Sequence, residues 1–131
     1  MNYKFYLQAT DGKFSTNATV SITVNDVNNN APVFEQSDYD TRVSEDTKEG
    51  AIIATVSAHD SDSGSNADIK YHIQKGAFDD FIIDEITGAI RVVKKLDYDN
   101  HRNYSIEIIA YDGGKGFYFL MRSRLRNVLK F

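Results

Sequence analysis

The sequence contains no cysteine and no tryptophan, and its one proline is Pro32. Without cysteine, neither disulfide bonds nor thiolate-bound zinc can hold the fold together, and thiol usage says nothing about the redox compartment. Long apolar runs are also absent. The longest covers residues 117–121, far short of the roughly 18–20 residues that cross a bilayer. The first residues lack the basic start, apolar run and cleavage site of a secretion signal, so we expect none in this stretch.

Length and composition are those of a small globular protein. The chain has 131 residues, of which 41% are hydrophobic and 26% are charged. This length allows one globular unit plus fragments, which argues against a multidomain enzyme. The composition argues against a fully disordered chain.

The charges are divided unevenly along the chain. Residues 115–131 hold five of the 15 basic residues and no acidic one, which leaves 10 basic and 19 acidic residues in the first 114 positions. This acidic body, with a net charge of -9, should repel phosphate backbones and attract hard cations. We therefore expect no nucleic-acid binding by the body.

An internal repeat relates the two ends of the chain. Residues 3–12 match residues 104–113 at a displacement of 101 positions, and the matching pairs are Tyr3 and Tyr104, Phe5 and Ile106, Leu7 and Ile108, Ala9 and Ala110, Asp11 and Asp112, and Gly12 and Gly113. In both copies, apolar residues alternate and then meet an Asp-Gly turn signal, as in a half-buried strand that enters a hairpin. The first copy continues into a second alternating run at 18–24, so we predict a hairpin over residues 1–24.

Further short alternating runs lie between the two copies, at 39–43, 52–59, 69–74, 81–83 and 90–92. They recur about every ten residues, and helical periodicity is weak throughout residues 1–114. The pattern predicts an all-β sandwich. Pro32, which follows the Asn-rich run 28–30, marks a boundary between domains.

The basic tail at 115–131 does not continue this pattern. A strand should follow Gly114, but the alternation is lost, so we predict that the last strand of the repeat is missing or replaced. As a helix, the tail would carry a basic stripe of Tyr118, Arg122, Arg126 and Lys130 that could contact an anionic membrane or an acidic partner. The alternative is a segment foreign to the fold, which would leave an open sheet edge and cause self-association.

Carboxylates gather at the ends of the expected strands, in two pairs with a spacing of two. Asp60 and Asp62 follow one strand, and Asp97 and Asp99 follow another. Residues i and i+2 of an extended segment point the same way, so each pair can face one point. Calcium, which takes 6–8 oxygen ligands in flexible geometry, suits such a cluster.

Other interpretations of the polar residues compete with this one. A carboxylate pair could act as general acid and base, as in glycosidases, but these polar loops favour two ionised groups rather than one raised pKa. The histidines His59, His72 and His101 lack zinc-site spacing. Four further acidic residues match no motif and are expected to be solvated turn residues, namely Asp79, Asp80, Asp84 and Glu85.

Five segments, in this order, resemble motifs of the cadherin family. The segment 26–34, DVNNNAPVF, resembles the linker between cadherin repeats, and Glu45 lies at the place of an early acidic residue of the family. The segment 58–66 resembles the Asp-x-Asp loop, 96–99 the Leu-Asp-x-Glu segment, and 110–113 the Ala-x-Asp-x-Gly strand end. The resemblance implies an immunoglobulin-like Greek-key β-sandwich, that is, a cadherin repeat.

The resemblance also implies two sets of calcium ligands. The first set, at the front junction, comprises Asp26, the Val27 carbonyl, Asn28, Asn29, the Asn30 carbonyl, Asp60, Asp62, the Asn66 carbonyl and Asp112. The second set belongs to the next junction and is incomplete here, with Glu45, Asp97 and Asp99. Asn29 stands where the family usually has Asp, and the lost negative charge should lower affinity at the inner ions.

On this resemblance, the chain divides into four parts. Residues 1–24 are the C-terminal hairpin of a preceding repeat, 25–31 a calcium-binding linker, 32–114 a cadherin repeat and 115–131 a basic tail outside the family pattern. The implied function is calcium-dependent cell-cell adhesion, with other cadherin molecules as partners, on the extracellular side of the plasma membrane. We expect no enzymatic activity. The alternative is a calcium-binding spacer module of a secreted enzyme or matrix protein.

Two N-glycosylation sequons fit an extracellular protein. They begin at Asn17, which we expect in a hairpin loop, and at Asn103, just before a strand.

Overall fold

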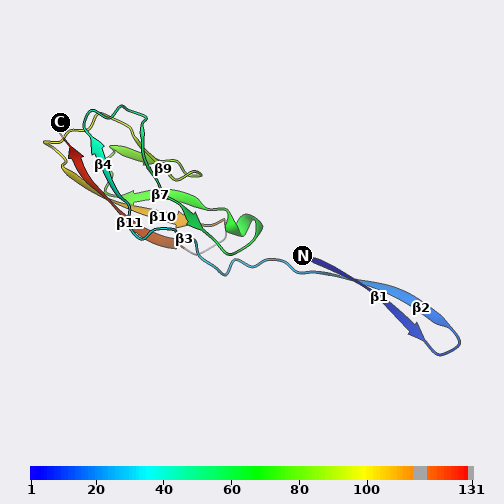
Figure 1. The fold of residues 1–131 in the computed structure, drawn as a ribbon. Coiled ribbons are helices and arrows are strands. Elements are labelled where there is room, and N and C mark those ends of the chain that lie inside the picture. The colour runs from blue at the N-terminus through cyan, green and yellow to red at the C-terminus, as the bar shows by residue number, and fades with distance from the viewer. Residues whose placement is uncertain (114–117, 130–131) are drawn as a thin grey trace.

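The computed structural model describes residues 1–113 and 118–129. It begins with the predicted hairpin, in which β1 (Asn2–Thr10) pairs antiparallel with β2 (Ser15–Thr23). Asp11 stabilises the turn, because its carboxylate accepts hydrogen bonds from the backbone N–H groups of Lys13 at 2.9 Å and Phe14 at 2.7 Å. The hairpin projects away from the rest of the molecule, to which a single extended segment joins it (Figure 1).

The rest of the described chain is a β-sandwich body. Its strands are β3 (Val33–Phe34), β4 (Asp40–Ser44), β5 (Ile52–Thr55), β6 (Ala58–His59), β7 (Lys70–Lys75), β8 (Phe81–Ile83), β9 (Ala89–Val92), β10 (Asn103–Tyr111) and β11 (Tyr118–Leu129). One sheet has the order β4-β11-β10-β7, a second has the order β5-β9-β8, and β3 pairs with β6. The one helical element among the described residues is the short 3-10 helix η1 (Gly64–Ala67). The all-β prediction is confirmed.

The core lies between the two larger sheets. β10 contributes the alternating residues Tyr104, Ile106, Ile108 and Ala110, which are at most 2% exposed, and β9 contributes Ile90 and Val92, which are fully buried. These are the residues that the period-two pattern assigned to the inward face of their strands. The core therefore holds β10 in place, and with it the loops that enter and leave this strand.

The tail does not behave as predicted. Residues 118–129 form β11, which pairs antiparallel with β10 and parallel with β4. The last strand is therefore replaced and not missing, the edge of β10 is not open, and the helix considered as one alternative does not form. Of the tail, residues 115–117 and 130–131 lie outside the described residues. β11 forms because its two neighbours, β10 and β4, offer backbone hydrogen bonds on either side of it, and pairing through the backbone does not require strict side-chain alternation. The sequence that replaces the family pattern thus still occupies the place of a last strand.

Candidate metal centre

Three separate segments meet where the linker joins the body. They are the linker itself between β2 and β3, the loop from β6 to η1, and the residue that follows β10. The apolar alternation that buries β10 places Asp112 at the end of this strand, next to the linker. Every residue predicted for the front junction lies in one of these three segments, apart from Asn66, which lies in η1.

Asn28 and Asp112 form the buried contact of this site. The side-chain amide of Asn28 donates from Nδ2 to Oδ1 of Asp112 at 2.7 Å, and Asp112 is only 4% exposed. A neutral donor to a buried carboxylate makes a charge-assisted hydrogen bond, which is stronger than one between neutral groups. This contact ties the middle of the linker to the end of β10.

Asp62 holds the next two linker residues. Its Oδ2 atom accepts the backbone N–H groups of Asn29 at 3.1 Å and Asn30 at 3.0 Å, and its Oδ1 atom accepts a hydrogen bond from the Asn30 side chain. Asp60 in turn accepts the backbone N–H of Asp62 on its Oδ1 atom at 2.8 Å, as in an Asx turn. The spacing of two therefore places the two carboxylates in one turn, with Asp62 directed toward the linker.

Asp26 attaches the first part of the linker to the η1 loop. Its Oδ2 atom accepts the backbone N–H of Ser63 and the side-chain amide of Asn66, each at 3.0 Å. These hydrogen bonds, from Asn66 first and Ser63 second, hold the pKa of Asp26 below its ordinary value of 3.8. The carboxylate is therefore ionised at neutral pH. Asn66 was predicted to act through its carbonyl, and the structure shows a role for its side chain.

Two oxygen atoms of the site lack donors. Among the described residues, Oδ1 of Asn28 and Oδ2 of Asp60 are buried and have no hydrogen-bond partner. Burying a hydrogen-bond acceptor without a donor is unfavourable unless a cation takes the place of the donor. Both oxygens belong to residues of the predicted ligand set.

Asn29 lies among further oxygens. With its amide nitrogen turned inward, it donates to Oδ1 of Asp62 at 2.9 Å and to the Val27 carbonyl at 3.2 Å. With its oxygen turned inward, Oδ1 of Asn29 accepts a hydrogen bond from Nδ2 of Asn30 at 3.0 Å and lies beside the Asp62 carboxylate and the Val27 carbonyl. Within the described chain, no three His, Asp or Glu side chains form a group that could hold a metal ion by themselves. A metal here would therefore need the amide and carbonyl oxygens of the linker.

The second predicted set lies at the other end of the body. Glu45 follows β4, and its Oε2 atom accepts the backbone N–H of Tyr98 at 3.4 Å, while Asp97 accepts the backbone N–H of Asp99 at 2.9 Å. These three carboxylates line a cavity of about 380 Å³. Because Asp99 precedes β10 and Asp112 follows it, roughly 30 Å of strand separates the two sets.

Some contacts in these sites carried no sequence signal. The backbone N–H of Ser63 could not be predicted as a donor, because any residue can supply it. Asp46 lines the same cavity as Glu45 and was also missed, although its position beside Glu45 was a usable signal. Both sequon asparagines are exposed, but Asn17 lies within β2 rather than in the predicted loop, and Asn103 begins β10.

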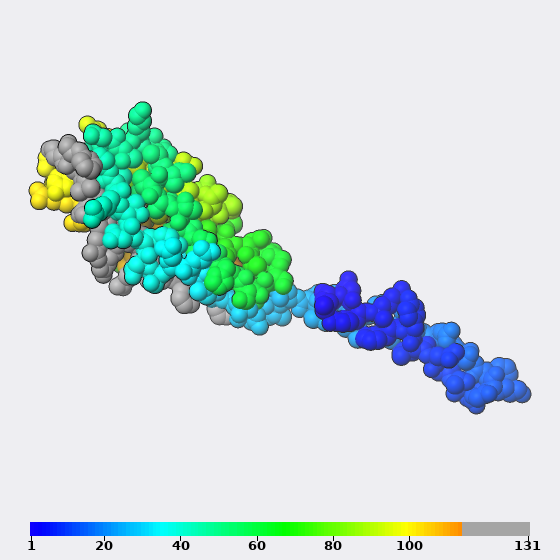
Figure 2. Space-filling model, in the orientation of Figure 1, coloured from blue at the N-terminus to red at the C-terminus, as the bar shows by residue number. Residues whose placement is uncertain are grey.

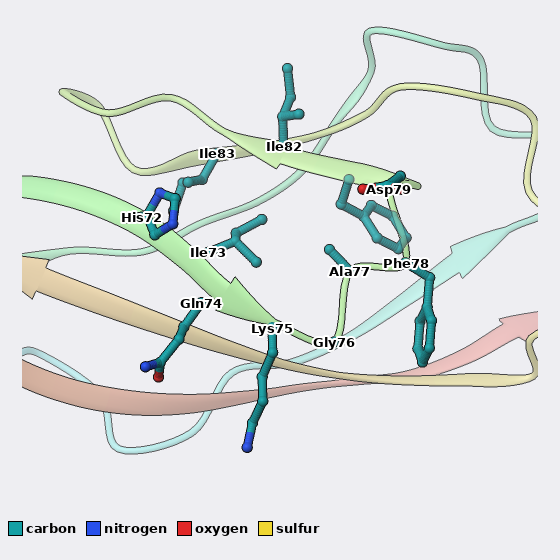
Figure 3. A pocket seen from close by; sticks show the side chains of 11 residues that line it. His72, Ile73, Gln74, Lys75, Gly76, Ala77, Phe78, Asp79, Ile82 and Ile83 are labelled. Carbon is teal, nitrogen blue, oxygen red and sulfur yellow. The ribbon is translucent and has the colours of Figure 1, made fainter.

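A groove between the edge strands β7 and β8 holds none of the predicted ligands. It encloses about 370 Å³ and its floor is mostly apolar, with Ile73, Phe81 and Ile83 among its lining residues. The side chain of Ile73 lies between the two strands, whereas the side chains of Gln74 and Lys75 point away from the space between them (Figure 3). The candidate metal centre is thus separate from this opening of the sandwich.

Comparison with known proteins identifies the family. The sequence pattern of the family described as "Cadherin domain" matches residues 39–118. The chain belongs to the cadherin family. Cadherin-87A of Drosophila melanogaster is 46% identical over 110 residues, which cover 84% of this chain and 6% of that protein. Human Cadherin EGF LAG seven-pass G-type receptor 2 is 40% identical over 120 residues, covering 87% of this chain and 4% of the receptor.

Solved cadherin structures share the fold. The structure of mouse clustered PcdhgC3 EC1-3 matches with a TM-score of 0.80 at 32% identity, over 95% of this chain and 42% of that chain. Mouse Cadherin-23 EC22-24 matches with a TM-score of 0.76 at 27% identity, over 95% of this chain and 41% of that chain. The predicted immunoglobulin-like sandwich of a cadherin repeat is therefore confirmed.

The relatives share one general role. They are cadherins, which are adhesion receptors rather than enzymes, and calcium binding is typical of cadherin repeats. This chain spans a small part of each relative, at most 6% of the two proteins named above. No helix among the described residues is long and apolar enough to cross a membrane.

Proposed function

We propose that this chain binds calcium at the junction between its linker and its body, and that binding stiffens the junction in a calcium-dependent adhesion protein. The observation that carries the proposal is the convergence of linker, η1 loop and β10 end around buried oxygens without donors, Oδ1 of Asn28 and Oδ2 of Asp60. The cadherin family to which the chain belongs supports the choice of metal.

The ligand chemistry fits a hard divalent cation. Carboxylate, amide and backbone carbonyl oxygens are the donors that calcium takes, in numbers of 6–8, whereas magnesium requires a stricter octahedron. We assign the front site to the Asp26, Asn28, Asp60, Asp62 and Asp112 side chains, with Asn29 and the carbonyls of Val27, Asn30 and Asn66. When bound, calcium supplies a positive charge shared by the linker and the body.

The chain's own residues determine the mechanical effect. Asp60, Asp62 and Asp112 belong to the body, and Asp26 and Asn28 belong to the linker. Without metal, the carboxylates repel one another, and hydrogen bonds alone hold the linker to the body. Ligands from both parts on a shared cation restrict bending, so the junction changes from a hinge to a rigid connection.

The same reasoning assigns the parts of the chain. We propose that residues 1–24 correspond to the last two strands of a preceding repeat, because β1 matches β10 position by position. Glu45, Asp97 and Asp99 would serve the next junction with ligands from another linker. The whole protein would then act outside the cell at the plasma membrane, with other cadherin molecules as partners. The relatives, all cadherins, support this assignment over a spacer module in a secreted enzyme or matrix protein.

Calorimetric calcium titration of the full chain tests the site. Replacing Asp60→Ala and Asp62→Ala together removes two ligands, and the matched control Asp38→Ala with Asp40→Ala removes the same charge outside the site. We expect the heat of calcium binding at the front site to disappear in the first variant and to remain in the control. Identical heats in the wild type and the Asp60/Asp62 variant would remove the metal assignment. Equal loss in both variants would show general charge attraction instead of a site.

A further inference from the structure

The sheet β4-β11-β10-β7 is basic, although the chain as a whole has a net charge of -4. Leaving histidine aside, the charged residues of its four strands are Arg42, Lys70, Lys75, Arg122, Arg124 and Arg126 against Asp40 and Glu107. The strands of the second sheet contain one charged residue, Arg91. Most carboxylates of the body therefore lie in its loops, and this one sheet holds a local excess of positive charge.

The arginines of β11 fall at alternate positions of the strand. With the β10 residue opposite each, they are Arg122 with Glu107, Arg124 with Ser105 and Arg126 with Asn103. These three β10 residues alternate with Tyr104, Ile106 and Ile108, whose side chains are buried in the core. Positions two apart in a strand share a face, so the register places the three arginines on the outer face of the sheet.

The neighbouring strands add two basic residues to this row. Arg42 of β4 is exposed, and the cyan segment that contains β4 lies at the surface of the body (Figure 2). Lys75 of β7 lies opposite Glu107, and its side chain is 67% exposed. Lys70 is not counted, because its Nζ atom lies 2.7 Å from Oε1 of Glu85. We define the basic stripe as Arg42, Lys75, Arg122, Arg124 and Arg126.

Ion pairs within the sheet leave part of this charge uncompensated. Glu107 lies opposite Arg122 and contacts Lys75 at 3.2 Å, and Asp40 lies opposite Arg124. Two carboxylates beside five basic residues leave an excess of three positive charges. The arginine positions span roughly 13 Å along β11, and neighbouring strands lie about 4.8 Å apart, so this excess is concentrated in a small area. A concentrated field of one sign attracts a ligand of the opposite sign.

We propose that the basic stripe binds a sulfated polysaccharide. The inference rests on the extracellular location of the proposed function, because sulfated polysaccharides belong to the outside of cells. Four of the five residues are arginines, and a guanidinium group binds an oxyanion through two parallel N–H groups. A row of such groups fits a chain that repeats its anionic groups along its length.

The outer face of the sheet favours a polysaccharide over an anionic membrane. Around the arginine positions, the outer residues of β4 and β10 are Asp40, Arg42, Asn103, Ser105 and Glu107, all of them polar or charged. Binding to a lipid surface requires apolar side chains buried among the headgroups in addition to positive charge. These positions offer charge and hydrogen bonds without such an apolar anchor.

Binding of the full chain to immobilised heparin, measured by surface plasmon resonance, tests the proposal. The stripe variant carries Arg122→Gln, Arg124→Gln and Arg126→Gln. The control variant carries Lys4→Gln, Lys13→Gln and Lys48→Gln, which remove three exposed positive charges outside this sheet. We expect the dissociation constant of the stripe variant to rise at least about tenfold, because three charge contacts are lost together. The control should bind as the wild type does, and salt should weaken binding of both.

A substitution in β10 keeps the test sharp if the stripe variant does not fold. Ser105 is exposed and lies opposite Arg124, in the middle of the stripe. Ser105→Glu adds a negative charge there, and Ser105→Gln adds a side chain of the same shape without the charge. We expect Ser105→Glu to weaken heparin binding and Ser105→Gln to leave it nearly unchanged. Equal binding by the two variants would contradict the proposal.

Other results would also overturn it. A wild-type chain that does not bind heparin has no such site, and equal weakening in the stripe and control variants would show a response to net charge alone. Hyaluronan, which carries no sulfate, should bind more weakly than heparin, and equal binding would remove the sulfate assignment. Vesicles of phosphatidylserine and phosphatidylcholine should not bind, and binding that the stripe variant loses would assign the stripe to a membrane.

The calcium proposal and this one fail separately. All heparin measurements are made with calcium chelated, and the stripe contains none of the proposed calcium ligands. Absence of heparin binding would leave the calcium titration unaffected. The Asp60/Asp62 variant should bind heparin at least as tightly as the wild type, and a loss of heparin binding in that variant would place the polyanion site at the linker and overturn the assignment to the stripe.

Discussion

The side chain of Asn28 in the linker donates to Asp112 at the end of β10 at 2.7 Å, although 84 positions separate them in the sequence. Asp62 holds the following two linker residues through their backbone N–H groups. The linker is thus attached to the body before any metal binds.

Removing this contact should loosen the linker even without calcium. We predict that Asn28→Ala increases the rate of proteolytic cleavage within residues 25–31 in the presence of chelator. A hydrogen bond to a charged group contributes about 1.5–3 kcal/mol, so cleavage through local opening should become roughly tenfold faster or more. Limited proteolysis followed by mass spectrometry measures the rate. Asn25→Ala is the control, and equal rates for the two variants would contradict the prediction.

Replacing Asn29 should strengthen the junction when calcium is present and weaken it when calcium is absent. Replacing Asn29→Asp adds a carboxylate next to Asp62, which should raise calcium affinity because affinity follows the charge of the ligands. Without calcium, the same two carboxylates repel each other, so the linker should be cleaved faster.

Calorimetry in calcium and proteolysis in chelator measure the two effects. Asn25→Asp adds the same charge at a position outside the motif and serves as the control. A tighter calcium site in both variants would show that the effect comes from general charge rather than from position 29.

A buried polar cluster far from the linker should affect stability alone. Tyr104 donates its hydroxyl to Asp80 at 2.6 Å, and Nζ of Lys94 lies 3.2 Å from the same carboxylate. Asp80 is 7% exposed, so the prediction that it is a solvated turn residue is wrong. We predict that Tyr104→Phe lowers the free energy of unfolding by about 1.5–3 kcal/mol, because the buried carboxylate loses a donor. Urea unfolding measures the loss, and Tyr6→Phe, at an exposed hydroxyl, should be neutral.

The same tyrosine predicts a dependence on pH. Burial first, and the hydrogen bond to Asp80 second, raise the pKa of Tyr104 well above its ordinary value of 10.0. Above pH 10 the unfolded chain therefore loses this proton while the folded chain keeps it, so stability falls as the pH rises. Tyr104→Phe should lack this part of the decline. An unchanged slope in unfolding experiments between pH 9 and 11 would contradict the assignment.

Two glycines allow the stability cost of an unfavourable backbone conformation to be measured apart from the cost of steric crowding. Gly76 and Gly50 both have positive φ, +88° and +83°, but a Cβ atom at Gly76 would lie 1.9 Å from the Ser105 carbonyl oxygen, and one at Gly50 would meet nothing within 4 Å. We predict that Gly50→Ala costs about 1–2 kcal/mol through its backbone alone. Gly76→Ala must in addition displace β10 and should cost clearly more. Chemical unfolding of both variants measures this difference, and equal losses would contradict it.

Sequence patterns predicted the parts of this molecule that repeat with a period of two. The inward residues of β10 follow that pattern because one face of the strand is fully buried, so burial and alternation coincide. β11 escaped prediction because its pairing depends on backbone groups of β10 and β4 and not on its own alternation. The two-residue strand β3 is too short for any periodicity.

The candidate site likewise has a part that the sequence predicted and a part that it did not. The pair Asp60 and Asp62 has a readable spacing, and the structure places it against the linker. The Asp26 contact with the Ser63 backbone had no such signal, because a backbone donor is identical at every residue except proline. The side-chain hydrogen bond from Asn66 to Asp26 was not predicted for a related reason: the sequence does not indicate that the amide of this asparagine reaches the linker. Its carbonyl stays a predicted ligand.

The sequon at Asn17 gives the last prediction. Asn17 and Thr19 are exposed and lie on the hairpin face that also carries Tyr6 and Gln8, so a glycan can project into solvent. Secreted from eukaryotic cells, the chain should carry an N-glycan there, and glycosidase treatment should reduce its mass accordingly. Asn103, also exposed at the start of β10, should carry a second glycan.

Single substitutions assign each glycan. Asn17→Gln and Thr19→Ala should each remove the same mass, because the acceptor requires both the amide and the hydroxyl of its sequon. Asn103→Gln should remove the other. Asn2→Gln changes an exposed asparagine of the same hairpin face that begins no sequon, and it should leave the mass pattern intact. A secreted chain whose mass does not respond to glycosidase would show that neither sequon is used.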